Sequence, residues 1–250
     1  MKISVITAVR NSRATLADAL DSALAQDHPN LELIVIDGVS TDGTQEVIQR
    51  YARRLEHVVS EPDQGIYDAL NKGLGLASGE VVGFLHADDR YADERVLSRV
   101  AAALADPAVD ACYGDLLYVR RDDPGRVVRC WRAGPYQPRR LAWGWMPPHP
   151  TFYTRRAIYQ RLGGFDPGYR IAADYDCLLR FLGAGQIACA YIPEVLVHMR
   201  LGGASNRSLR NLLQKSREDY RALRQNRIGG LGALLLKNLR KLPQFLIRPD

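Results

Sequence analysis

Two adjacent carboxylates, Asp88 and Asp89, come directly after the short apolar stretch at residues 81–85. Holding two like charges together at the end of a strand is costly unless a cation lies beside them. Mg²⁺ and Mn²⁺ prefer oxygen ligands and are commonly shared with substrate phosphates. The pair therefore predicts a metal-bridged diphosphate, although the same two acids also suit the start of a turn toward Asp93.

Strand-like and helix-like segments alternate through the first half of the chain, and they would position these acids. Short β-branched runs indicate strands, and apolar residues at helical spacing indicate helices. The expected strands span residues 3–9, 31–36, 58–59 and 81–85, and the expected helices span residues 12–23, 41–51, 66–77 and 93–104. This order predicts βαβ units in a parallel sheet with helices on both faces. Because ligands bind at the carboxyl ends of such strands, Asp37, Asp88 and Asp89 fall where a site is expected.

The second half of the chain is less regular. Asp123-Pro124-Gly125 marks a hairpin between strands at residues 111–119 and 127–131. Residues 134–150 are rich in Pro, Gly and Trp and predict a long functional loop. Short helices are expected over residues 155–162 and 175–182, and closing strands over residues 187–192 and 195–199.

A basic tail ends the sequence. The 250-residue chain has a formal net charge of +6, yet residues 1–199 hold 22 basic and 25 acidic side chains, whereas residues 200–250 hold 12 and 3. Two amphipathic helices are predicted there, separated by Gly229-Gly230. The apolar face of the first comprises Leu209, Leu212, Leu213, Tyr220 and Leu223, and the second is the Leu-rich stretch 231–247. Such a tail suits an anionic membrane surface, and packing on the protein body or on a second subunit is the alternative.

Composition and missing motifs exclude several classes of protein. A content of 46% hydrophobic and 25% charged residues is typical of a folded protein with a substantial core. The four scattered cysteines, without a Cys-x-x-Cys pair, argue against zinc or a redox dithiol. The first strand leads into TAVRNSRAT, which is neither a dinucleotide-binding glycine motif nor a P-loop. The tail lacks the interleaved aromatic residues typical of nucleic-acid binding. With no cleavable signal pattern and no apolar stretch near the roughly 20 residues that span a bilayer, we expect a cytoplasmic protein, either free or peripheral on the inner face of the cell membrane.

Five segments with distinctive motifs follow one another along the chain: SVITAVRNS, ELIVIDGVSTDGT, SEPDQGIYDALNKGLGLASGE, VGFLHADD and PPHPTFYTRRAIYQRLGGFDPGYRIAADYDCLLR. With these segments the chain resembles the inverting family 2 glycosyltransferases of the GT-A type, and among them the bacterial cell-surface polysaccharide, colanic-acid-like branch. The resemblance implies an α/β, Rossmann-like, mostly parallel sheet over residues 1–205, with a nucleotide-binding half (1–105) and an acceptor-binding half (106–205). Residues 206–250 would form the helical tail. The implied activity moves a sugar from a nucleotide donor, expected to be a UDP-sugar, to a saccharide or lipid-linked acceptor.

The same resemblance implies which residues contact the nucleotide. Thr7, Ala8 and Asn11 correspond to positions where the first strand meets the base and the ribose. Asp37 corresponds to an acid that hydrogen-bonds the uracil ring, and Asp63 to a position near the base. One carboxylate can pair with uracil or with guanine, so the identity of the base stays open.

For the metal, the resemblance assigns Asp88 and Asp89 to a paired-acid motif that binds Mg²⁺ or Mn²⁺. The first acid of that motif faces the ribose and the second takes the metal. His198, shortly before the Gly202–Ser205 turn, corresponds to a position that supplies a further metal or diphosphate contact in some related enzymes. The family usually has Asn or Asp where this chain has His86, which leaves both carboxylates of the motif in place.

Asp174 corresponds to the catalytic base of the family. The acceptor hydroxyl must lose its proton as it attacks the anomeric carbon, and a carboxylate within hydrogen-bond reach speeds such a step by about 10²–10⁴. A bound cation would stabilise the departing diphosphate, and a single displacement inverts the anomeric centre. Asp176 is the rival base, but two residues further along a helix it points away from Asp174.

Trp143, Trp145 and His149 are candidates for acceptor contact, because exposed indole rings stack on sugar faces. The alternative is that they anchor the long loop in the core. Two other functions stay open from the sequence. A sugar-phosphate nucleotidyltransferase would need a Gly-rich basic loop that TAVRNSRAT does not supply, and the presence of both Asp89 and Asp174 argues against a non-catalytic sugar-nucleotide-binding module.

Overall fold

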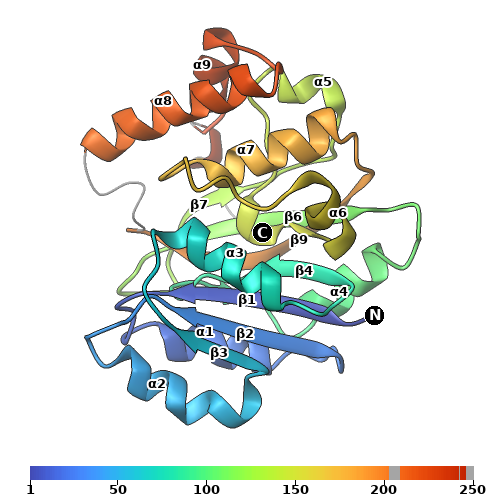
Figure 1. Ribbon diagram of the computed structural model, residues 1–250. Coiled ribbons are helices and arrows are strands. Elements are labelled where there is room, and N and C mark those ends of the chain that lie inside the picture. The colour runs from blue at the N-terminus through green and yellow to red at the C-terminus, as the bar shows by residue number, and fades with distance from the viewer. Residues whose placement is uncertain (203–208, 242, 246–250) are drawn as a thin grey trace.

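The computed structural model describes residues 1–202, 209–241 and 243–245 (Figure 1). A nine-stranded sheet runs through this part of the chain in the order β3-β2-β1-β4-β8-β6-β9-β5, and β7 pairs with β6. The strands are β1 (Ile3–Val9), β2 (Leu31–Asp37), β3 (His57–Ser60), β4 (Val81–Phe84), β5 (Arg90–Tyr91), β6 (Ala111–Val119), β7 (Val127–Trp131), β8 (Tyr153–Arg155) and β9 (Cys189–Arg200).

Helices cover both faces of the sheet, as the sequence predicts (Figure 1). The core on one face joins β1 and β2 to α1, α2 and α4, and the core on the other face joins them to α3, α6, α7 and the tail. The helices are α1 (Leu16–Leu24), α2 (Thr44–Tyr51), α3 (Ile66–Leu76), α4 (Val96–Ala103), α5 (Pro138–Leu141), α6 (Arg156–Leu162), α7 (Ala173–Leu179), α8 (Leu209–Gln225) and α9 (Leu231–Leu239). A π-helical turn, Arg180–Ala184, extends α7, and short 3-10 turns lie at Ala52–Arg54, His149–Thr151 and Pro243–Phe245.

The parallel half of the sheet is confirmed, and the other half is mixed. β1 pairs in parallel with β2 and β4, and β2 pairs in parallel with β3. β8 then pairs antiparallel with both β4 and β6, while β6 and β9 are parallel. β5 and β8 were not predicted, because strands of two or three residues leave no periodic pattern.

One long strand, β9, replaces the two closing strands expected from the sequence. Its pairing register with β6 jumps between Tyr191 and Val195, around Pro193. Proline cannot donate a hydrogen bond to a neighbouring strand, so it is accommodated in such an irregularity. The break in hydrophobic pattern is therefore a bulge within one strand.

The tail packs on the body of the protein. On α8, Ala222 and Leu223 are fully buried in the core shared with α7, and Ala233 of α9 is buried there too. The predicted apolar face of α8 is only partly right, because Leu212, Leu213 and Tyr220 remain exposed. Within the described ranges, no helix is both long enough and apolar enough to cross a bilayer.

A buried carboxylate ties the amino end of the sheet together. Glu32 on β2 is 1% exposed, and it forms an ion pair with Lys2 at 2.7 Å. It also accepts hydrogen bonds from the Ser4 hydroxyl and from the backbone N–H and hydroxyl of Ser78. Burial opposes ionisation of Glu32, but these partners outweigh it and lower its pKa to about 2.

We expect Glu32→Ala to lower the free energy of unfolding by about 2–3 kcal/mol at about pH 7, because it leaves the buried hydroxyl of Ser4 without its acceptor and removes the contacts with Ser78 and Lys2. A carboxyl whose pKa is lowered by folding stabilises the protein above its ordinary pKa of 4.5, and this contribution is lost as the pH falls toward about 2. Urea unfolding curves should therefore show the variant and wild type converging in acid. The exposed Glu46→Ala serves as the control and should stay within about 0.5 kcal/mol of wild type. A gap that is unchanged at about pH 3 would contradict this account.

Candidate active site

Asp88 and Asp89 lie in the turn between β4 and β5, at the carboxyl end of β4. Asp89 is buried, and its Oδ2 atom has no hydrogen-bond partner among the described residues. Its Oδ1 atom accepts a hydrogen bond from the backbone N–H of Arg200 at 3.2 Å. Burial, together with the neighbouring Asp88 carboxylate, raises the pKa of Asp89 well above its usual value. A buried carboxylate with an unused oxygen, next to a second carboxylate, fits a divalent cation.

The described part of the chain offers these two acids to a cation without a third protein ligand. It contains no group of three or more His, Cys, Asp or Glu side chains that could hold a metal ion. The prediction that His198 joins the acids therefore needs correction. Its register places it opposite Arg90 on β5, and its Nδ1 atom lies 3.4 Å from that guanidinium group. The arrangement suits Mg²⁺ or Mn²⁺ that completes its coordination with water and substrate oxygens.

Asp174 lies in the first turn of α7 and is partly exposed. Its carboxylate is 3.2 Å from the hydroxyl of Tyr67 on α3, which also donates to the backbone oxygen of Ile171 at 2.7 Å. Asp176 is buried and committed elsewhere: it forms an ion pair with Arg180 at 2.8 Å and accepts a hydrogen bond from Asn226 at 2.8 Å. Of the two acids, Asp174 has the carboxylate available to accept a proton.

His86 and Tyr118 connect the paired acids to Asp174. Burial lowers the pKa of His86, while the carboxylates of Asp88 and Asp174 both oppose that shift. Burial also raises the pKa of Tyr118 on β6; Arg129 and Lys215 oppose the shift, and Asp89 and Asp174 reinforce it. Charges influence a side chain in this way only from nearby. Acids that are far apart in the sequence therefore meet at one site.

His149 lies beneath this site, not on its surface. Its ring is 5% exposed, stacks on Phe84 with 5.5 Å between ring centroids, and lies 6.4 Å from the ring of His86. Burial lowers the pKa of His149 to about 4, although Asp174 opposes the shift. Nε2 of His149 and Nδ1 of His86 have no hydrogen-bond partner in the described structure. The two rings are therefore uncharged polar groups near neutral pH.

The two tryptophans of the long loop have different surroundings. Trp145 is 5% exposed, stacks on Tyr136, and donates a hydrogen bond from Nε1 to the backbone oxygen of Ala133 at 2.8 Å. It anchors the loop in the core, so the expectation that it offers an exposed face to a sugar is corrected. Trp143 is 56% exposed, but it lies beside α9, where its backbone oxygen accepts a hydrogen bond from Arg240.

The role predicted for Asp37 also needs correction. Side chains alternate along a strand, and Asp37 falls on the side of β2 that faces α2, away from Asp174. It is fully buried and accepts hydrogen bonds from the Ser40 hydroxyl, from the Ser60 hydroxyl at 2.7 Å and from the Gln45 amide at 3.2 Å. Its carboxylate is used within the fold and is not free for a nucleobase.

Asp63 lies at the carboxyl end of β2 in place of Asp37. A Cβ atom added to Gly38 would come within 2.1 Å of the Asp63 carboxylate, so the carboxylate occupies space that only glycine leaves free. Asp63 is partly exposed and accepts a hydrogen bond from the N–H of Gly65 at 2.9 Å. Asn11 lies just beyond the carboxyl end of β1 and is exposed. Its side chain accepts a hydrogen bond from the N–H of Thr41 at 2.9 Å.

Thr7 and Ala8 are both buried in β1. The alternation of the strand places Thr7 with Ile3, Val5 and Val9 on the α1 side, so the expectation that its side chain meets the nucleotide is corrected. Ala8 belongs to the opposite core, which contains Tyr67 and Phe84. It faces the same side of the sheet as Asp174.

Sequence reasoning missed Arg200 and Tyr118. The Arg200 guanidinium is buried, forms an ion pair with Asp18, and donates to the backbone oxygen of Asp88 at 3.2 Å. In the sequence, Arg200 stands at the start of the basic tail, so its position at the end of β9 was not predicted. For Tyr118 the only signal was its position near the end of a predicted strand.

Comparison with known proteins shows what this arrangement resembles. Residues 4–173 match the family model described as Glycosyl transferase family 2. A PGL/p-HBAD biosynthesis glycosyltransferase of Mycobacterium bovis is 31% identical over 208 residues, which is 81% of this chain and 78% of that protein. A putative teichuronic acid biosynthesis glycosyltransferase of Bacillus subtilis, TuaG, is 38% identical over 97 residues, which is 38% of each chain.

Solved structures share the fold. TarS 1–349 of S. aureus in complex with UDP-GlcNAc matches with a TM-score of 0.69 and 21% identity, over 90% of this chain and 65% of that one. This chain thus spans slightly less than two thirds of that TarS segment. The mannosyltransferase PcManGT of Pyrobaculum calidifontis, in complex with GDP-Man and Mn²⁺, matches with a TM-score of 0.68 and 24% identity, over 98% of this chain and 73% of that one. The GT-A architecture expected from the sequence is thereby confirmed.

The different surroundings of Asp37 and Asp63 lead to a stability prediction. We expect Asp37→Ala to lower the free energy of unfolding by about 2–3 kcal/mol, because it leaves the buried N–H and hydroxyl of Ser40 without their acceptor and removes the hydrogen bonds from Gln45 and Ser60. Asp63→Ala should change it by less than about 1 kcal/mol, because Asp63 is partly exposed and loses one backbone hydrogen bond. Urea unfolding at neutral pH measures both variants. Equal costs for the two would show that Asp37 is not the structural acid of the pair.

Proposed function

Since this chain belongs to glycosyl transferase family 2, we propose that it transfers a sugar from a nucleoside-diphosphate donor, expected to be a UDP-sugar, to a hydroxyl of a saccharide or lipid-linked acceptor. The observation that carries this proposal is the buried carboxylate of Asp89, with an unused oxygen, beside Asp88 at the carboxyl end of β4. The charge of Asp174 acts on the neighbouring His86 and Tyr118 together with those of the paired acids. The names of its relatives, in glycolipid and teichuronic acid biosynthesis, support a place in cell-surface polysaccharide synthesis.

In the proposed reaction, Asp174 accepts the proton of the acceptor hydroxyl as its oxygen attacks the anomeric carbon. The bond from that carbon to the diphosphate breaks on the opposite face, so the configuration inverts. Asp89 and Asp88 would hold Mg²⁺ or Mn²⁺, which stabilises the negative charge of the leaving diphosphate when it is bound. Tyr67 orients Asp174 from α3. The uncharged rings of His86 and His149 line the floor of the site without adding positive charge beside the base.

For the nucleotide, we assign Asp63 in place of Asp37 to the base, with Asn11 and the strand end at Ala8 beside it. Asp63 combines a partly exposed carboxylate with a location at the carboxyl edge of the parallel strands, where ligands bind in such sheets. The solved relatives hold UDP-GlcNAc in one case and GDP-Man in another. UDP is the first donor nucleotide to test and GDP the second.

Two substitutions separate metal binding from catalysis. We expect Asp89→Asn to weaken Mn²⁺-dependent UDP binding roughly tenfold or more, because it removes charge from the metal site. Asp174→Asn should bind UDP and Mn²⁺ like wild type, while its rate of sugar transfer falls by about 10²–10⁴. Isothermal titration with UDP, with and without Mn²⁺, and a nucleotide-release assay measure the two effects. Near-normal turnover by Asp174→Asn would refute the assignment of the base.

We further propose that the exposed side of α9 rests on a membrane surface. Leu231, Leu235 and Leu239 are spaced one helical turn apart and are 64%, 64% and 57% exposed, respectively. Trp143 is also exposed and lies beside the same helix, because the backbone of Gly144 packs directly on α9: a Cβ atom there would lie 2.3 Å from the backbone oxygen of Ala233. A leucine stripe with a tryptophan and flanking basic residues is typical of a helix that lies in a bilayer interface.

The paired substitutions Leu235→Asn and Leu239→Asn should lower binding to phosphatidylglycerol vesicles roughly tenfold, because they remove apolar area that the bilayer would cover. Leu213→Asn is the matched control, since Leu213 is also 64% exposed but lies on α8. Vesicle sedimentation measures the bound fraction. Point substitutions are preferable to deleting α9, because Ala233 and Lys237 of α9 are buried against the body. Equal sedimentation of the paired variant and Leu213→Asn would overturn the membrane assignment.

A further inference from the structure

The inner side of α9 carries a buried lysine. Lys237 is 5% exposed, and its ammonium group lies 2.7 Å from the carboxylate of Asp219 on α8 and 3.2 Å from the centre of the Tyr175 ring on α7. Lys215, one helical turn before Asp219, donates to the same carboxylate at 3.0 Å. Two ammonium groups therefore share one buried acid.

A third lysine adds to this positive charge. Lys241 is partly buried one turn beyond Lys237, and its ammonium group donates to the side chain of Asn238 at 2.9 Å. Burial and the neighbouring Lys215 lower the pKa of Lys237 to about 7 and that of Lys241 to about 8. Among the described residues, the lysine cluster of Lys215, Lys237 and Lys241 has Asp219 as its single ion-pair partner. An excess of partly buried positive charge is costly without a bound anion.

The lysine cluster adjoins the catalytic base. Tyr175, which carries the Lys237 contact, directly follows Asp174 in α7. The Asp174 carboxylate also favours the charged forms of Lys215 and Lys237, which requires it to be near both. Figure 1 shows α8 and α9 stacked over α7, on the side of α7 away from β1 and β4. The cluster thus lies beside Asp174.

We propose that the lysine cluster binds a phosphate or diphosphate group of the acceptor, so that the enzyme acts on a phosphate-bearing acceptor in preference to a neutral saccharide. This inference rests on the proposed function and deepens it by naming the acceptor class. Charge-assisted contacts from ammonium groups to phosphate oxygens are strong and short-ranged. They would hold the acceptor close to the carboxylate that takes its proton. The exposed leucines of α9, on the opposite side of the same helix, suit an acceptor whose phosphate is attached to a lipid.

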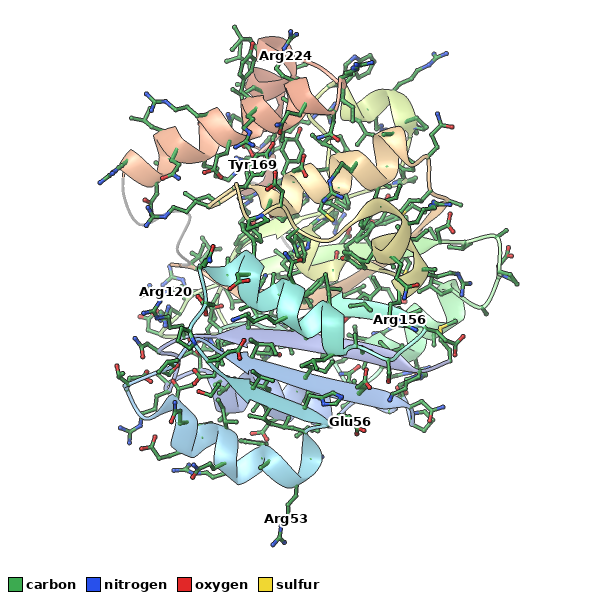
Figure 2. The ribbon with its side chains drawn as sticks, in the orientation of Figure 1. Arg53, Glu56, Arg120, Arg156, Tyr169 and Arg224 are labelled. Atoms are coloured by element: carbon green, nitrogen blue, oxygen red, sulfur yellow. The ribbon has the colours of Figure 1, made fainter. Side chains whose placement is uncertain are left out.

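The first test is anion binding without metal. Wild type should bind octyl phosphate in the presence of EDTA, and should bind its neutral counterpart octyl glucoside at least roughly tenfold more weakly. The double variant Lys215→Gln, Lys241→Gln should weaken octyl phosphate binding roughly tenfold or more. It keeps Lys237 with Asp219, so the contact between α8 and α9 is retained. Arg224→Gln is the matched control, because Arg224 is exposed on α8 (Figure 2) and has no recorded contact with the three lysines, and it should leave octyl phosphate binding within about twofold of wild type.

The second test identifies the source of the phosphate. The same saccharide is offered in detergent, without lipid, as a farnesyl diphosphate conjugate and as a farnesyl glycoside. Wild type should favour the diphosphate conjugate in kcat/KM, and the double variant should lose that preference through KM, while its Mn²⁺-dependent UDP binding stays normal. Loss of phosphatidylglycerol vesicle binding with an unchanged acceptor preference would assign the cluster to lipid headgroups and overturn the proposal.

Octyl phosphate binding that is equal in wild type and the double variant would also overturn it, and would leave the cluster with a purely structural role. Wild type that fails to bind UDP with Mn²⁺ would instead contradict the proposed function. The two failures are therefore distinguishable.

Discussion

The adjacent carboxylates at the end of β4 impose the constraint on which the rest of the site depends. Asp89 is buried with one oxygen unused, and Asp88 is directly beside it. The guanidinium of Arg200, which lies beside them, is engaged by Asp18 and by a backbone oxygen. Within the described part of the chain, these acids concentrate negative charge that Arg200 offsets only in part. β9 and α7 bring Arg200 and Asp174 toward the same place, an arrangement that suits the proposed cation and its phosphate ligands.

The order of elements and the location of the site could be predicted from the sequence, because both follow from residue patterns. Apolar periodicity identifies the four parallel strands, and polar residues after them mark the edge where ligands bind. The direction of a single side chain does not follow from such patterns. Asp37 and Thr7 lie at the right edge of the sheet, yet strand alternation turns both toward the α1 and α2 side, and Asp63 from the next loop takes the position by Gly38.

Long-range contacts account for the other differences. Trp145 and Trp143 stand two residues apart in one loop, yet one stacks on Tyr136 in the core and the other lies beside α9. Which of them is exposed depends on where α9 docks, and α9 is nearly a hundred residues away in the sequence. The tail itself has two apolar sides, and the sequence does not say which one packs. The region that matches the family model ends at residue 173, just before Asp174, so the elements that shape the acceptor side lie beyond it.

The two sides of helix α9 have different chemical character. One side carries Lys237 within reach of the catalytic region, and the other carries three exposed leucines. An enzyme held by the second side would meet its substrate by lateral diffusion within a sheet of lipid, so encounter rates would follow the amount of substrate per unit of membrane area and not per volume of cytosol. Elongation of a surface glycan would then be paced by how densely its carrier is packed in the leaflet.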